Sequence, residues 1–200
     1  MRFPHVLRAA GLLPLLLPLV AAAHGGADGG THHGLGFLQG LMHPLTGPDH
    51  LAAMLAVGCW SALTARRVWL APLAFALTLM VGALAGLAGL PVPGVEPAIV
   101  ASLLVLGLLV ATQKVLPTVT AATLVASFAL FHGIAHGQEL AGATTPWPAL
   151  AGMGLATIAL HLAGIVLGRW LQRAGNGPTR AAGGAVVLLG LTLLAQLVQA

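Results

Sequence analysis

Long apolar segments joined by short connections constrain this chain more than any other feature of its sequence. Hydrophobic residues make up 58% of the 200 positions, and charged residues make up only 6%. An apolar segment of about 20 residues is long enough to cross the hydrocarbon core of a bilayer as a helix. We therefore predict an all-α, polytopic membrane protein whose main partner is the lipid bilayer. Connections this short leave no room for a soluble catalytic domain.

The apolar segments, and the Gly and Pro residues between them, predict six transmembrane helices. Their expected ranges are 35–63, 68–90, 97–113, 118–140, 147–170 and 181–198. The longest connection would be residues 171–180, which include Gly175, Gly177 and Pro178. Three spans in each half of the chain would give two halves of opposite orientation, a 3+3 inverted arrangement.

The start of the chain has the pattern of a cleavable signal peptide. Two arginines precede or flank an apolar core at residues 9–20, and three alanines follow it at a typical cleavage position. The predicted organisation is a signal peptide at residues 1–23, a Gly/His-rich periplasmic segment at 24–34 and a six-helix membrane domain at 35–200. An uncleaved first helix is the alternative, which two prolines in the apolar core disfavour.

The basic residues predict the orientation of the membrane domain. If the mature N-terminus is periplasmic, every basic residue left after cleavage lies in a cytoplasmic connection, as the positive-inside rule requires. These residues are Arg66, Arg67, Lys114, Arg169, Arg173 and Arg180. The expected location is thus the bacterial inner membrane. Because the basic residues are scattered rather than clustered, we expect no nucleic-acid partner.

Histidines and acids interrupt two of the apolar segments. The first span contains His43, Asp49 and His50, and the fourth contains His132, His136 and Glu139. In the fourth span the spacings of four and three residues stack the side chains on one helical face. Ionisable groups at membrane depth are costly and usually functional.

Pro44 and the Gly47–Pro48 pair are expected to break the first helix, because proline lacks an amide hydrogen and disfavours a helical predecessor. Pro48 suits the first turn of a restarted helix, with Asp49 near its positive end. Transporters use such broken helices to hold ions. Both motifs would lie in the outer half of the bilayer and could face each other.

The residue types indicate the ion. Neutral imidazoles together with carboxylates favour borderline transition metals such as nickel, cobalt, copper or zinc, whereas magnesium and calcium prefer oxygen ligands. The lone Cys59 excludes an internal disulfide and a paired-cysteine metal site. The predicted metal ligands are His43, Asp49, His50, His132, His136 and Glu139. We expect the metal to be a transported or bound ion, and we predict no resident cofactor.

Four other histidines are secondary metal candidates. His24, His32 and His33 could form a polar tether or capture metal ahead of the membrane domain. His161 in the fifth span has the pattern of a hydrogen-bonded packing residue, with a place on the ion path as the alternative.

Two further sets of residues are expected to serve the membrane domain rather than its chemistry. Gly82-x-x-x-Gly86 and Gly164-x-x-x-Gly168 predict close helix packing. The four tryptophans are expected to anchor helix ends at the membrane interfaces. They are Trp60, Trp69, Trp147 and Trp170.

The two histidine motifs resemble those of the HupE/UreJ family of nickel-related membrane proteins. That family has a His-Pro-x-x-Gly-x-Asp-His segment in the first span and a Phe-His-Gly-x-Ala-His-Gly-x-Glu segment in the fourth. Both segments are present without departure, at His43, Pro44, Gly47, Asp49 and His50, and at Phe131, His132, Gly133, Ala135, His136, Gly137 and Glu139. The resemblance implies uptake of nickel, or of cobalt, for hydrogenase or urease maturation.

We therefore predict a transition-metal permease, with nickel as its substrate, and no enzymatic activity. A metal-binding accessory protein that does not translocate the ion is the main alternative, and a homo-oligomer is compatible with either. An intramembrane zinc hydrolase is a further alternative. The sequence disfavours it, because it has neither a His-Glu-x-x-His motif nor a Gly-x-Ser-Gly turn.

Overall fold

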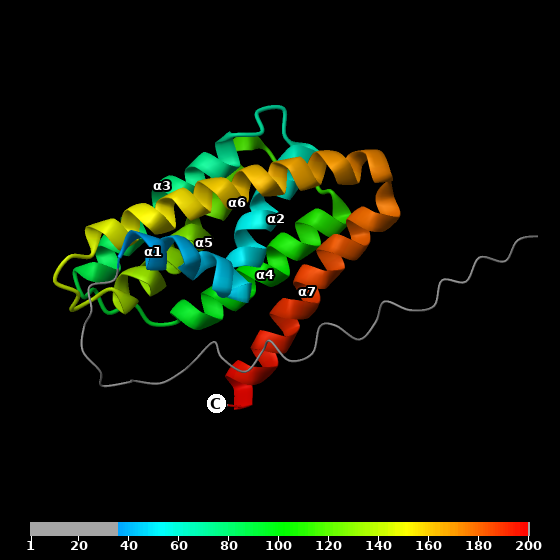
Figure 1. Ribbon diagram of the computed structural model, residues 1–200. Coiled ribbons are helices and arrows are strands. Elements are labelled where there is room, and N and C mark those ends of the chain that lie inside the picture. Colours follow the sequence, from blue (N-terminus) through cyan, green and yellow to red (C-terminus); the bar gives the residue numbers. More distant parts are fainter. Residues whose placement is uncertain (1–35, 200) are drawn as a thin grey trace, which may run out of the picture. The chain divides into compact units, whose positions relative to one another are not determined.

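The computed structural model describes residues 36–199, which form seven α-helices and no strand (Figure 1). The helices are α1 (Phe37–Thr46), α2 (Pro48–Thr64), α3 (Leu70–Leu87), α4 (Val95–Thr112), α5 (Thr118–Glu139), α6 (Trp147–Ala174) and α7 (Asn176–Gln199). The all-α prediction is confirmed for this part of the chain. The predicted signal peptide and Gly/His-rich segment lie outside the described residues.

Five of these helices are long and apolar enough to cross a membrane. They are α3, α4, α5, α6 and α7, which occupy the second to the sixth predicted spans. Apolar side chains cover the outside of the bundle on several helices; Leu77 of α3 and Leu188 of α7, for example, are exposed. Such a surface is suited to lipid rather than water, so the chain is an integral membrane protein.

The first predicted span is built from two short helices. α1 ends at Thr46 and α2 begins at Pro48, and Gly47 between them has extended backbone angles. Pro48 explains the break, because it has no amide hydrogen to continue α1 and disfavours a helical conformation at Gly47. The predicted break is therefore confirmed at Gly47. The prediction that Pro44 also breaks the helix is wrong. Pro44 lies inside α1, which tolerates the single missing hydrogen bond.

The long connection predicted before the last helix does not exist. α6 continues to Ala174 and α7 starts at Asn176, so Gly175 alone joins them, with a φ of 100° that favours glycine. Pro178 lies in the first turn of α7, where backbone amides have no helical partner in any case. The Gly/Pro-rich stretch is thus a helix start rather than a loop.

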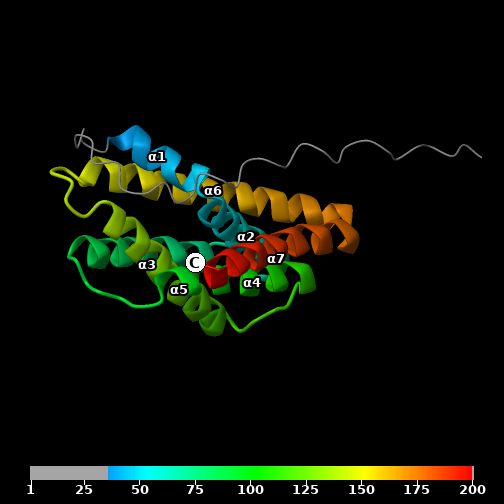
Figure 2. The same cartoon turned by 90° about the horizontal axis from the view of Figure 1, so that it is seen from below.

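Glycines bring the helices into close pairs. α3 packs along α5, α2 along α6, and α4 along α7 (Figures 1 and 2). At Gly82 and Gly86 of α3, an added Cβ atom would collide with the backbone carbonyls of Leu130 and Ile134 in α5. The predicted role of this glycine pair in close helix contact is confirmed.

The second predicted glycine pair works in the same way. Cβ atoms added at Gly164 and Gly168 of α6 would strike the α2 backbone at Leu55 and Cys59. Gly107 of α4 and Gly183 of α7, which the sequence analysis did not single out, allow the third close pair. Each long helix pair thus has glycine at its contact.

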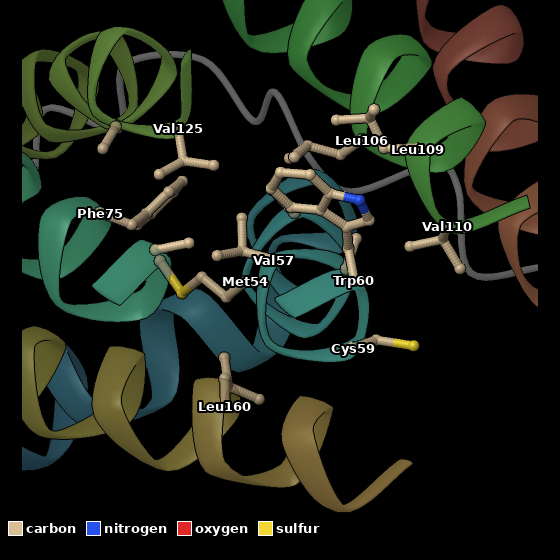
Figure 3. Packing of buried hydrophobic residues seen from close by; sticks show 14 of the residues in the cluster. Met54, Val57, Cys59, Trp60, Phe75, Leu106, Leu109, Val110, Val125 and Leu160 are labelled. Atoms are coloured by element: carbon tan, nitrogen blue, oxygen red, sulfur yellow. The ribbon is translucent and has the colours of Figure 1, made fainter. Parts of the chain in front are cut away.

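The core lies around α2, which contacts α1, α3, α4, α6 and α7. Met54, Val57 and Trp60 of α2 are buried in one cluster with Phe75 of α3 and Leu106 of α4 (Figure 3). The prediction for Trp60 is wrong: it is only 2% exposed, and its Nε1–H donates a hydrogen bond to the Lys114 carbonyl. The other three tryptophans are exposed near helix ends, as interface anchors should be. They are Trp69, Trp147 and Trp170.

Candidate metal centre

Four histidine rings from the two separate motifs meet in one cluster. The ring centroid of His136 lies 4.3 Å from that of His50 and 5.0 Å from that of His43. His132 extends the cluster on the other side, with its centroid 4.8 Å from that of His50. We call these four residues the histidine cluster. It joins the broken α1–α2 segment to the end of α5.

The local sequence of α5 explains how this helix can face two neighbours at once. His132 and His136 point toward the α1–α2 segment, while Gly133 and Gly137 follow them on the adjacent face. Cβ atoms added at the two glycines would collide with backbone atoms of α3. The alternation of His and Gly therefore lets α5 pack against α3 while it presents its imidazoles to the cluster.

Each motif adds one carboxylate to the cluster. His43 Nε2 lies 2.8 Å from Glu139 Oε2, and His136 Nδ1 lies 3.9 Å from the same oxygen. Ligand atoms of His43, His136 and Glu139 all lie within 4.8 Å of one another, so they could converge on one metal ion. His50 Nδ1–H donates to Asp49 Oδ1 at 2.9 Å. This contact orients the His50 ring and leaves its Nε2 free, as carboxylates do beside metal-binding histidines.

Several ring nitrogens of the cluster are buried without a hydrogen-bond partner. They are His50 Nε2, His132 Nδ1, and both Nδ1 and Nε2 of His136. Buried polar atoms in proteins are nearly always paired, because leaving one unpaired costs about 1–3 kcal/mol. A neutral imidazole nitrogen can instead direct its lone pair to a metal ion. The arrangement is suited to a ligand that takes up these lone pairs.

Exposure changes across the cluster. The His43 and Glu139 side chains are 36% and 51% exposed, whereas His132 and His136 are fully buried. An ion could therefore first meet His43 and Glu139 and then the buried imidazoles. The two exposed residues lie near helix ends: His43 comes shortly before the break that ends α1, and Glu139 is the last residue of α5.

Two residues that the sequence analysis did not single out contact the histidine cluster. Ser102 of α4 is buried, and its Oγ lies 3.0 Å from His132 Nε2. The Phe75 ring lies against the His132 ring, with centroids 5.8 Å apart. A lone Ser or Phe in an apolar span has no spacing that could identify it. Only the packing of α3 and α4 on α5 brings them to the site.

The secondary candidates do not join the cluster in the described part of the chain. His161 donates from Nδ1 to the Met54 carbonyl at 2.9 Å and packs edge-on against Phe75. It is a hydrogen-bonded packing residue of the α2–α6 contact, although its buried Nε2 has no partner. His24, His32 and His33 lie outside the described residues.

The fold and the site together define a class: an integral membrane protein whose helices enclose an imidazole and carboxylate cluster. The chain belongs to the HupE / UreJ protein family, whose pattern it matches over residues 12–193. The sequence-based identification of the family is confirmed.

One curated relative is Protein HupE of Rhizobium leguminosarum bv. viciae. The two sequences are 43% identical over 185 residues, which cover 92% of this chain and 94% of the relative. No solved structure gives a significant match to this chain.

Proposed function

We propose that this protein is a bacterial inner-membrane permease for a divalent transition metal, with nickel as its substrate. The observation that carries the proposal is the meeting of four imidazoles from two distant motifs, with several buried nitrogens left unpaired. Transport requires a site that binds the ion strongly enough to remove its water yet can exchange it. Imidazole nitrogens meet that requirement, because they are suitable ligands for borderline transition metals.

The ligand set favours a borderline metal. Four imidazoles and two carboxylates suit nickel, cobalt, copper or zinc, whereas magnesium and calcium prefer oxygen ligands. The charges of Asp49 and Glu139 would balance one divalent cation. Within this group, the resemblance of both motifs to those of the nickel-related HupE/UreJ family favours nickel.

The proposed topology has six crossings, with α1 and α2 together forming the first. A periplasmic N-terminus then places the histidine cluster in the outer half of the bilayer. The ion would enter at His43 and Glu139, exchange water for the imidazoles of His136 and His50, and reach the fully buried His132. Rearrangement of the two three-span halves would release it toward the cytoplasm.

Nickel accumulation in cells tests this proposal. The variants are His132→Ala, Asp49→Ala and Glu139→Ala, compared at matched expression with Ser127→Ala. Ser127 is an exposed residue of α5 whose hydroxyl bonds only to the Leu124 carbonyl of its own helix. We expect each site variant to lose about tenfold or more of the accumulation, and Ser127→Ala to match the wild type. Unchanged accumulation in all three site variants would defeat the proposal.

A further inference from the structure

Ser102 is the one polar side chain of α4 in contact with the histidine cluster. It is fully buried, and its Oγ has two polar neighbours. The Ile99 carbonyl oxygen, one helical turn earlier, lies at 2.6 Å, and His132 Nε2 lies at 3.0 Å. Both distances are within hydrogen-bonding range.

The hydrogen atoms in these two contacts can be assigned. A carbonyl oxygen can only accept, so the single hydroxyl hydrogen of Ser102 is donated to Ile99 across the shorter distance. The Ser102 oxygen must then accept in its contact with His132, which requires a hydrogen on Nε2. A neutral imidazole carries only one N–H, and so His132 Nδ1 is left with a bare lone pair.

We propose that Ser102 is a positioning residue of the metal centre: it holds His132 in the tautomer whose Nδ1 binds the metal ion. This nitrogen is buried and has no partner, and the ring that carries it packs against His50. The metal-binding part of the inference rests on the proposed function. The tautomer follows from the geometry of the metal-free protein alone.

Ser102 would act on His132 as Asp49 acts on His50. In both cases an oxygen accepts one ring N–H and leaves the other ring nitrogen unpaired. The difference is charge. Asp49 and Glu139 already balance a divalent cation, and a third carboxylate would leave the occupied site with net negative charge at membrane depth. A neutral hydroxyl fixes the tautomer without that cost.

The first test measures the tautomer directly in metal-free wild-type protein. The protein is labelled with ¹⁵N-histidine and studied in lipid nanodiscs by NMR, and the His132 signals are assigned by their loss in His132→Gln. We expect hydrogen on Nε2 and none on Nδ1. Hydrogen on Nδ1 would overturn the proposal, and this measurement needs no Ser102 variant to fold.

The second test measures nickel affinity by calorimetry on purified Ser102→Ala. Ser61→Ala is the matched control, because Ser61 is an equally buried serine that donates to the Val68 carbonyl and touches no histidine. We expect about tenfold weaker binding for Ser102→Ala, the usual effect of losing such an outer contact, and wild-type affinity for the control. Equal affinity in the two variants would overturn the positioning role. Absence of nickel binding in the wild type would contradict the proposed function instead, while the tautomer measurement still decides the role of Ser102.

Discussion

His136 is fully buried in the histidine cluster, and neither of its ring nitrogens has a hydrogen-bond partner. An apolar side chain of similar size would remove the cost of burying these two atoms, which is about 1–3 kcal/mol for each unpaired group. We predict that His136→Leu raises the melting temperature of the metal-free protein and abolishes the further rise that added nickel causes in the wild type.

Thermal unfolding in detergent checks this prediction, with His161→Leu as the comparison. His161 is also buried but keeps one hydrogen bond, to the Met54 carbonyl, so its replacement should stabilise the protein less. A metal-free His136→Leu protein that unfolds at a lower temperature than the wild type would show that its imidazole stabilises the fold. The unpaired nitrogens would then not indicate a ligand.

The imidazoles of the histidine cluster should also determine how nickel binding depends on pH. Only a neutral imidazole binds a metal ion, so protons compete with nickel. We predict that nickel affinity weakens as pH falls through about 6 to 7, the ordinary range in which imidazole takes up a proton. His43 is the most exposed member of the cluster, and its replacement in His43→Gln should reduce this step. Calorimetric titrations across this range provide the measurement, and a flat profile in the wild type would contradict it.

At the residue level the ligand types could be read from the sequence, because histidines and acids stand out in apolar spans. The partners that orient them could not. Ser102 reaches His132 from a helix 30 positions away in the chain, and no spacing rule links the two. Trp60 was misplaced for the same reason, since its burial depends on how α4 packs on α2 rather than on its own segment.

At the level of elements, the His-Gly pairs of α5 couple helix packing to the metal centre. A Cβ atom at Gly133 would collide with the Leu79 carbonyl of α3. We predict that Gly133→Ala pushes α5 away from α3, lowers the melting temperature and weakens nickel binding several-fold, although every candidate ligand remains.

Gly184→Ala is the matched control for this prediction. Gly184 lies in α7 with no atom near its would-be Cβ position, and alanine is the better helix former by about 1 kcal/mol. This variant should keep wild-type affinity and unfold at the same or a higher temperature. If Gly133→Ala behaves like Gly184→Ala, the close α3–α5 contact does not position the histidines.

The positions of most helices could be predicted, because the length of an apolar segment and the position of a proline affect the helix in which they lie. The break at Gly47 followed from Pro48, and the ends of α3, α4 and α5 lie within three residues of the predicted spans. The start of α7 was not predictable from composition. Gly175, with its positive φ, ends α6 alone, and Pro178 fits the first turn of α7 instead of a loop.

For the whole molecule, the order of helix pairing supports the proposed two halves. If α1–α2 counts as one span, the first span pairs with the fifth, the second with the fourth and the third with the sixth. Exchange of the two three-span halves leaves this set of pairs unchanged. The histidine cluster joins the first and the fourth predicted spans. In the proposed arrangement the ion site would therefore lie where the two halves meet, as in transporters built from inverted repeats.

This pairing could not be read from hydrophobicity, since lipid and protein surfaces are equally apolar inside a membrane. The two glycine pairs recognised in the sequence identified faces for close contact but not their partners. Gly82 faces α5 and Gly164 faces α2, and each assignment needed the fold. The convergence of the two histidine motifs was predicted only because both were expected in the same half of the bilayer.

Nickel uptake by purified protein reconstituted in liposomes tests whether this molecule transports the ion its site is proposed to bind. We predict time-dependent accumulation of nickel above that of protein-free vesicles. Excess cobalt should reduce this uptake and excess magnesium should not, and His132→Ala should abolish it. Protein that binds nickel in these vesicles but never accumulates it inside them would contradict the permease and indicate an accessory metal-binding protein.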